Sequence, residues 1–557
     1  MNKKLHVISF YITLVFLSAV MIFYVCQKEG WHEDEIFSYG SSNYRYDNVF
    51  RSYGEKDTVN TIIYDKIAAG NIKETLDNAL YYLNNPVEFN KLYDEIEGSH
   101  SPVWKTREEA LDYLKISSDD VLNFGSVYYN QLRDVHPPLF YFLVHIVSSL
   151  FFGVFSKYII FTVSLVFFIA SCFVVRKILI LLNREYLTVA VLLLYGLSMG
   201  AVSTVMFQRM YMMLTFFVLC YLYLNIKIYK SSFFMNKKIS VQLCSVTVLG
   251  FLTQYFFCIF AFFTAAVSVF AMIYYKKYKQ MRRYLLLHVL SAAAGIMLFP
   301  ASIYHIFFSY RGVPALSGSD NYLTKITEFI RMVFQSFSIP DILGLILFIV
   351  LTAALIFILL KSKQKFIILI FTVPVIGFLI LSAEISPYIE LRYIMCVLPV
   401  IAAACVLATD NILHIIVKNN KINTVLIICS VLCLSIYGIF ACEPGFLYKG
   451  YNNYLEIAKN NSSLRFVFVG ENNFNHIQSL PEYSIYEKSL ILNENQLDVL
   501  TDNSELTNKD EFILSVKKYI GAEKILNSVL ENTGFENYEI LLDDSGDVGC
   551  IIYKIKR

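Results

Sequence analysis

Long apolar segments alternate with short polar ones along the chain up to about residue 441. A helix that crosses a bilayer needs about 20 mainly apolar residues, so each such segment is a candidate span. The pattern predicts about eleven spans, at residues 5–26, 157–175, 187–206, 209–227, 239–254, 257–275, 285–307, 341–360, 366–382, 392–409 and 422–441. The first follows a basic "MNKK" but has a long apolar core and no small-residue cleavage site, which favours an anchor over a signal peptide. The predicted fold is mainly α, polytopic and transmembrane.

Composition agrees with a membrane protein. Of 557 residues, 56% are hydrophobic and 17% are charged, and a soluble protein of this length carries more charge. The net charge of +2 gives no reason to predict a nucleic-acid partner. Most of the 11 cysteines fall in apolar runs, without disulfide or zinc spacing.

The orientation follows from clusters of Lys and Arg in short loops, which favour the cytoplasmic side. All these clusters lie on one side only if the apolar segment 137–155 does not cross the membrane. Tyr141, His145, Ser148 and Ser149 give this segment a mildly polar helical face, which is typical of a helix along the membrane surface. The alternative is an ordinary second span that breaks the charge rule.

This assignment predicts a multi-pass protein of the plasma membrane with a cytoplasmic N-terminus. Residues 28–136 form a large, acidic outer loop, and 308–340 form another external loop. The membrane module is expected to end near 441, and 442–557 to form a small extracytoplasmic α/β domain. In that domain we predict a strand at 465–470, a helix from the periodicity of 511–531, and a hairpin turning at 544–547.

Candidate chemistry begins in "WHEDEIFSYG", just after the first predicted span. Asp34 and Glu35 lie so near hydrocarbon that their burial is costly unless something pairs or uses them. Such surroundings are expected to raise their pKa values, which suits a general base near neutral pH. Taken alone, "EDE" is better explained as a solvated acidic turn that marks the outer side.

Further polar groups are predicted on the same outer face. They are Asp134 and His136 in "RDVHPPLFY", Arg209 and Tyr211 in "FQRMY", Gln254 and Tyr255 in "TQYFF", and Arg392 and Tyr393 in "PYIELRY". Each arginine alone could extend along the membrane surface. Two arginines opposite an acidic loop suggest a site for an anionic group.

This combination fits the transfer of a sugar from a lipid phosphate to a hydroxyl. The phosphate is a competent leaving group whose developing charge arginine can stabilise. The acceptor hydroxyl then needs one general base, and attack opposite the phosphate inverts the anomeric centre.

The ordered motifs resemble a known family. "DE" (Asp34, Glu35), "DxHPPLFY" (134–141), "QRMY" (208–211), "LTQYFF" (252–257) and "RYxxxxLP" (392–399) are similar to those of bacterial GT-C membrane glycosyltransferases. The nearest group is family 39, which is related to protein O-mannosyltransferases and to the lipid A aminoarabinose transferase. The similarity runs from residue 1 to about 441.

The resemblance implies a polyprenyl-phosphate sugar donor and inverting transfer to an extracytoplasmic acceptor. Asp34 would be the base, with Glu35 assisting acceptor binding. Arg209 and Arg392 would bind the donor phosphate, with Tyr211 and His136 nearby. It also implies that 137–155 is a juxtamembrane helix.

Two positions depart from the family pattern. Many relatives carry an acid where this chain has Phe207 and a histidine where it has Gln254. A metal site built from such ligands is therefore not predicted, and neither is a cofactor.

Residues 321–337 predict an amphipathic helix, with Leu323, Ile326 and Ile330 on its apolar face. Such a helix could cover the rim of the bundle or act as a lid over the donor, with Arg311 touching phosphate.

Two other functions fit parts of the pattern. A transporter or flippase of a lipid-linked saccharide would explain the many spans, but transporters place ionisable residues near the bilayer midplane and often show repeated halves. A scaffolding protein would leave the motifs unexplained. The sequence does not indicate which sugar is moved, which acceptor is used, or the oligomeric state.

Overall fold

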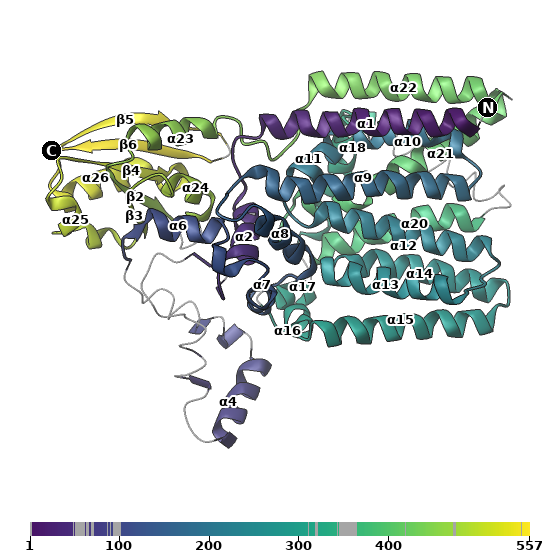
Figure 1. The fold of residues 1–557 in the computed structure, drawn as a ribbon, viewed down its shortest axis with the longest axis horizontal. Helices are drawn as coiled ribbons and strands as arrows, with labels where there is room; N and C mark the ends of the chain where they lie inside the picture. Colours follow the sequence, from purple (N-terminus) through teal and green to yellow (C-terminus); the bar gives the residue numbers. More distant parts are fainter. Residues whose placement is uncertain are drawn as a thin grey trace.

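The computed structural model consists of a bundle of long, roughly parallel helices and, beyond one end of it, a domain built on a β-sheet (Figure 1). The N-terminus lies at the end of the bundle away from this domain. The structure describes residues 3–47, 49–50, 62, 66–67, 72–85, 87–89, 91–92, 102–309, 311–317, 321–341, 343–344, 365–417, 419–471, 475–546 and 548–557.

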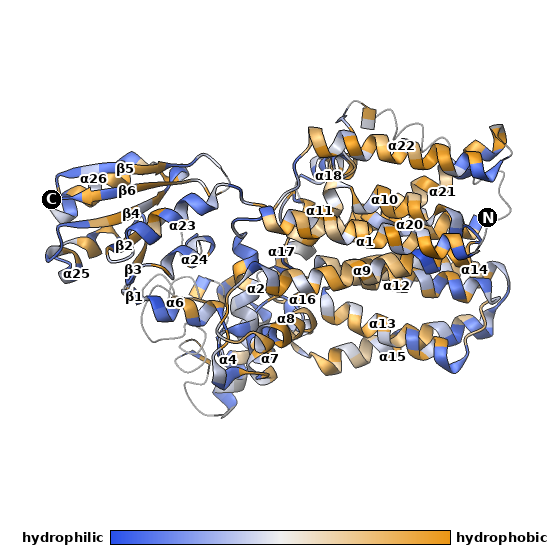
Figure 2. Cartoon of the chain, turned by 45° about the horizontal axis from the view of Figure 1, so that its top comes forward, coloured by the Kyte–Doolittle hydropathy of each residue, from blue (hydrophilic) through white to orange (hydrophobic). Residues whose placement is uncertain are grey.

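Within these ranges, eight helices are long and apolar enough to cross a membrane. They are α1 (Lys3–Gln27), α9 (Lys157–Leu181), α12 (Tyr211–Lys230), α14 (Phe257–Tyr274), α15 (Tyr278–Leu298), α20 (Lys365–Ile385), α21 (Leu398–Ile416) and α22 (Asn420–Ala441). Their residues are mostly hydrophobic along the bundle, with hydrophilic residues gathered toward its ends (Figure 2). The protein is therefore a multi-pass, mainly α membrane protein.

The other predicted spans have different outcomes. Residues 187–206 form two helices, α10 (Thr188–Gly196) and α11 (Met199–Met206), with a bend of 65° at the break. The segment predicted at 239–254 is α13 (Lys237–Thr253), which has 17 residues and is short for a crossing. The span predicted at 341–360 lies almost entirely outside the described residues.

The boundaries predicted for the span 285–307 were wrong. α15 begins at Tyr278 and ends at Leu298, and Ala301–Phe307 form a separate short helix, α16, capped by Pro300. The physical reason is the proline, because the residue before a proline is disfavoured in helical conformation.

The apolar segment 137–155 contains α8 (Leu139–Leu150), a helix of 12 residues at the end of the bundle (Figure 1). At 1.5 Å per residue it is about 18 Å long, too short for a hydrocarbon core of about 30 Å. Its polar face is buried against α2 (Glu33–Asn43), where His145 Nδ1 lies 2.6 Å from the Ser42 carbonyl oxygen. The polar side chains of α8 therefore serve packing against the protein.

The C-terminal domain contains a six-stranded mixed sheet in the order β1-β3-β2-β4-β6-β5. The strands are β1 (Lys105–Thr106), β2 (Arg465–Gly470), β3 (Lys488–Asn493), β4 (Glu511–Lys517), β5 (Asn537–Asp543) and β6 (Cys550–Lys556). β2, β3 and β4 are parallel, and β1, β5 and β6 are antiparallel to their neighbours. The α/β prediction for this part of the chain is confirmed.

The local predictions in this domain were partly right. β2 and the hairpin of β5 and β6 lie where the pattern predicted them. The helix predicted over 511–531 was wrong, since 511–517 form β4 and the helix, α26, spans Ala522–Thr533. β4 is buried along almost its whole length, so its sequence does not alternate between apolar and polar residues. An apolar run without this alternation cannot be distinguished from part of a helix. Gly521, with φ of +81°, separates the two elements.

The outer loop is attached to this domain. β1 pairs with β3 through Lys105 opposite Ser489, and the indole N–H of Trp104 donates to Asn503 Oδ1 (3.1 Å). The helix that follows, α6 (Arg107–Leu114), packs on α24 (Leu480–Tyr483). The loop and the C-terminal domain are thus joined beyond the end of the bundle.

A buried carboxyl in this domain predicts a pH effect on stability. Glu482 is fully buried, and within the described residues its carboxylate oxygens have no hydrogen-bond partner. Burial raises the pKa of Glu482 well above its ordinary value, while Lys517 acts to lower it. A carboxyl with a raised folded-state pKa contributes stability below its ordinary pKa and loses it as pH rises toward the folded value.

We therefore expect the thermal stability of the purified protein to fall between pH 5 and pH 8. Glu482→Gln, which cannot ionise, should flatten this dependence and be the more stable protein at pH 8. Melting curves in detergent at several pH values measure the effect. Equal slopes for the two proteins would contradict it.

Candidate active site

Asp34 lies in the first turn of α2, directly after the first span. His32 caps this helix: its Nδ1 accepts the Asp34 N–H (3.0 Å), and its own N–H donates to Glu35 Oε2 (2.7 Å). Burial lowers the pKa of His32 to about 4, so the neutral ring can accept this bond. The cap fixes the direction of the Asp34 side chain, which forms an ion pair with Arg392.

Arg209 connects α2 to α8. Its side chain is 3% exposed, and its Nη1 donates to the Asp34 carbonyl oxygen (3.0 Å), Ser38 Oγ (3.0 Å) and Tyr141 OH (3.2 Å). Its Nη2 lies 3.4 Å from His136 Nε2. A buried guanidinium held by neutral oxygens keeps much of its charge available to an anion.

His136 and Asp134 lie next to Arg209 on the segment that leads into α8. Their Nδ1 and Oδ2 atoms are 3.0 Å apart. Although burial acts to raise the pKa of Asp134, His136 and Arg209 lower it to about 2. Asp134 is therefore ionised at neutral pH.

Arg392 approaches from the short helical turn Leu391–Tyr393, just before α21. Its Nη2 donates to Glu390 Oε1 (2.9 Å), and its Nε lies 2.8 Å from Glu390 Oε2. The guanidinium also lies 5.3 Å from the ring centre of Tyr393, which stacks on Phe256 at 5.5 Å. Asp34, Asp134, His136, Arg209 and Arg392 thus form one connected group, here named the Asp34 cluster.

The electrostatics of Asp34 differ from the sequence expectation. Burial alone would raise its pKa, but Arg209 and Arg392 outweigh it and lower the pKa below the ordinary range. The expected rise at Asp34 was wrong, because the sequence did not show that Arg392 pairs with this carboxylate and that the charge of Arg209 lies close to it. Asp34 is ionised at neutral pH.

Glu35 has surroundings of a different kind. Its side chain is fully buried, and its carboxylate accepts from Lys28 Nζ (2.9 and 3.1 Å) and from the Gln208 N–H (2.7 Å). Burial raises the pKa of Glu35, against Lys28. This geometry favours a structural role for Glu35 over the acceptor contact expected from sequence.

The remaining predicted residues lie around the cluster in different ways. Tyr211 is 5% exposed and, with Asp34, raises the pKa of Arg392 against the effect of burial, so it is near that guanidinium. Tyr255 OH lies 2.9 Å from His305 Nδ1. Gln254 Oε1 accepts the Phe256 N–H (2.5 Å), and within the described residues no hydrogen bond joins the Gln254 side chain to Arg209 or Arg392.

Several residues around the site were not predicted from sequence. Lys28 was missed because a single lysine after a span has no distinctive pattern. His305 lies in α16, inside a segment that was interpreted as membrane span.

The amphipathic helix predicted at 321–337 is α18 (Tyr322–Ser336). Arg311, which was predicted to touch the donor phosphate, lies 5.5 Å from the ring centre of Tyr388.

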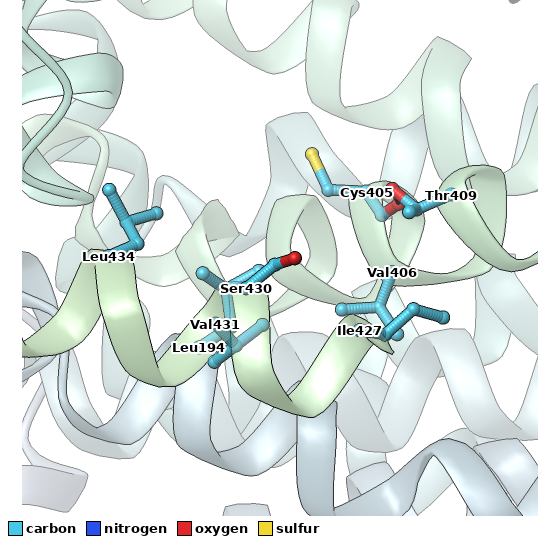
Figure 3. Close-up of a pocket in the computed structure, with 8 residues that line it drawn as sticks. All are labelled: Leu194, Cys405, Val406, Thr409, Ile427, Ser430, Val431 and Leu434. Atoms are coloured by element: carbon cyan, nitrogen blue, oxygen red, sulfur yellow. Dashed lines mark hydrogen bonds between the residues drawn. The ribbon is translucent and has the colours of Figure 1, made fainter. Parts of the chain in front are cut away.

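In the part of the chain that the structure describes, neither a metal site nor the apolar pocket between α10, α21 and α22 coincides with the cluster. Among the described residues, no group of three or more His, Cys, Asp or Glu could hold a metal ion. An apolar cavity of about 150 Å³ lies between α10, α21 and α22, within the bundle (Figure 3). No charged residue lines it, so we assign it no part in the chemistry.

Comparisons with known proteins give a likeness of fold. No family model and no curated protein match the chain. ArnT from Cupriavidus metallidurans in the apo state is 11% identical, with a TM-score of 0.42, over 75% of this chain and 87% of that chain. The same protein bound to undecaprenyl phosphate is 10% identical, with a TM-score of 0.49, over 99% and 98%. At these values the likeness assigns no substrate and no site residue to this chain.

Proposed function

We propose that this protein is an inverting glycosyltransferase that moves a sugar from a polyprenyl-phosphate donor to a hydroxyl of an extracytoplasmic acceptor. The observation that carries the proposal is the Asp34 cluster, in which the ionised Asp34 carboxylate pairs with Arg392 and the Asp34 carbonyl oxygen accepts from Arg209. The motif resemblance to GT-C glycosyltransferases points to the same reaction.

Arg209 and Arg392 are the proposed ligands of the donor phosphate. Guanidinium groups bind phosphate oxygens through charge-assisted, often bidentate bonds, and the same bonds stabilise the charge that develops when the phosphate leaves. His136 and Tyr141 contact Arg209 and would hold its plane.

Asp34 is the proposed general base. During transfer the acceptor oxygen forms the new bond to the anomeric carbon, its proton passes to Asp34, and the electron pair of the broken C–O bond leaves with the phosphate. Glycoside hydrolysis uses two carboxyl groups because its leaving group must be protonated, whereas a phosphate leaves as an anion. One base is therefore sufficient.

The Asp34 cluster is proposed to lie on the extracytoplasmic side. α2, which carries Asp34, and α8 lie at the end of the bundle next to the C-terminal domain and away from the N-terminus (Figure 1). The basic N-terminus and the lysine-rich loops favour the cytoplasm for the opposite end.

A flippase for a lipid-linked saccharide is the main alternative. A flippase must carry its charged substrate group across the hydrocarbon core, so its ionisable residues are expected near the midplane. The Asp34 cluster lies at one end of the bundle instead, which favours transfer chemistry.

The proposed function is tested with purified protein, a polyprenyl-phosphate sugar labelled in the sugar, and cell-envelope extracts as acceptors. We expect label in a new product whose anomeric configuration, read by NMR, is opposite to that of the donor. Retention of configuration would contradict the single displacement. Movement of intact donor across proteoliposomes without transfer would favour the flippase.

A further inference from the structure

The three nitrogens of the Arg392 guanidinium are divided between two carboxylates. Nη2 donates to Glu390 Oε1 (2.9 Å), and Nε lies 2.8 Å from Glu390 Oε2 but, among the described residues, makes no hydrogen bond. Nη1 faces Asp34 Oδ2. A charge-assisted hydrogen bond within a close ion pair holds the guanidinium in position, whereas Nη1 can change its partner.

Glu390 keeps its place through further neighbours. Its side chain is 36% exposed, and that of Arg392 is 9% exposed, so the pair lies at the edge of the buried cluster. Burial and Asp34 raise the pKa of Glu390, while Arg392 and Arg311, which lies over the ring of Tyr388, act to lower it. These two positive charges favour the ionised carboxylate that pairs with Arg392.

Asp34 is a weaker base while it is paired with Arg392. A carboxylate paired with Arg392 and close to the charge of Arg209 is a weak base, because efficient proton transfer needs a base whose pKa is near the working pH. A donor phosphate offers Arg392 Nη1 a stronger anionic partner. Phosphate binding would remove the paired guanidinium from Asp34 and so strengthen Asp34 as a base.

We propose that Glu390 is a positioning residue, which holds the Arg392 guanidinium through Nη2 so that Nη1 passes from Asp34 to the donor phosphate. This inference rests on the proposed function. It assigns no new chemical step, since the proton, the electron pair and the leaving phosphate go where the proposed reaction takes them. Under this proposal, binding of the donor phosphate frees the Asp34 carboxylate from Arg392.

The test is Glu390→Gln, which preserves shape and removes the charge. We expect the KM for the polyprenyl-phosphate sugar to rise about tenfold, the size expected when a charged hydrogen-bonded pair is lost, with the acceptor KM close to that of the unsubstituted protein. Glu384→Gln, in the last turns of α20, is the matched control and should leave both constants unchanged.

The pH profile of kcat distinguishes this role of Glu390 from a purely structural one, because a structural defect alone would not shift the profile. The titratable and charged groups near Asp34 include Arg209, Arg392, His32, His136, Glu33 and Glu390. Removing the negative charge of Glu390 lowers the pKa of Asp34, so the acid limb of the profile should move to lower pH in Glu390→Gln.

The outcomes separate the two proposals. If the unsubstituted protein transfers sugar and Glu390→Gln has the same donor KM and the same acid limb, the inference is overturned and the proposed function stands. Equal rises in donor and acceptor KM with an unmoved acid limb also overturn it, since they indicate a general structural defect. If the unsubstituted protein transfers no sugar from any polyprenyl-phosphate donor, both proposals fall.

Discussion

Asp34→Asn is expected to lower sugar transfer by a factor of about 100 or more, the usual effect of losing a general base. The amide is nearly the same shape as the carboxylate but cannot take the acceptor proton. It also releases Arg392, so binding of the polyprenyl-phosphate donor should be retained or become tighter. Turnover with labelled donor and a separate binding measurement with polyprenyl phosphate distinguish the two effects.

Glu33→Gln is the matched control for this substitution. Glu33 is the exposed neighbour in the same helical turn, and we assign it no role in transfer. Its variant should have activity close to that of the unsubstituted protein. If Asp34→Asn and Glu33→Gln had equal, nearly full turnover, Asp34 would not be the base.

Lys28→Met is expected to destabilise the protein by about 3–5 kcal/mol, because it leaves a buried carboxylate without its charge partner. Lys28 and Glu35 are both 0% exposed, and Lys28 Nζ also donates to the Phe446 carbonyl oxygen (2.5 Å). The variant should melt at a markedly lower temperature in detergent.

The double variant Lys28→Met/Glu35→Gln supplies the control. With the isolated charge removed, it should recover much of the stability lost by Lys28→Met alone. A double variant that is destabilised by the sum of two independent losses would show that the ion pair is not the reason. Glu35 binds both Lys28 and the His32 N–H at the start of α2, so loss of Lys28 should disturb this cap and the position of Asp34. Transfer activity of Lys28→Met should therefore fall even at temperatures where the variant is folded.

The residues of the Asp34 cluster could be predicted from sequence because membrane topology restricts where polar groups emerge. Asp34, Arg209 and Arg392 are far apart in the chain, yet each follows or precedes an apolar span on the same predicted side. The positive-inside pattern was therefore sufficient to place them on one face. Which atoms meet was not predictable: the pairing of Arg392 with both Asp34 and Glu390 depends on helix packing.

The errors also have physical reasons. The sign of the pKa change at Asp34 depends on the ion pair with Arg392 and on the nearby charge of Arg209, and the sequence predicts only a shared face. β4 was predicted as helix because a strand buried on both faces has no period of two. The end of α15 was predictable from Pro300, and the apolar pattern that continues past this proline obscured it.

The pairing of β1 with β3 restricts the order in which the chain can fold during synthesis. Lys105 leaves the ribosome early, whereas its partner Ser489 is synthesised after every helix of the bundle. Long-range strand pairing of this kind is slow, because a large loop must close before its contacts form. The edge of the sheet is therefore completed only after translation of the membrane helices, and a nascent chain that stops before Lys488 would leave the early segment exposed outside the membrane.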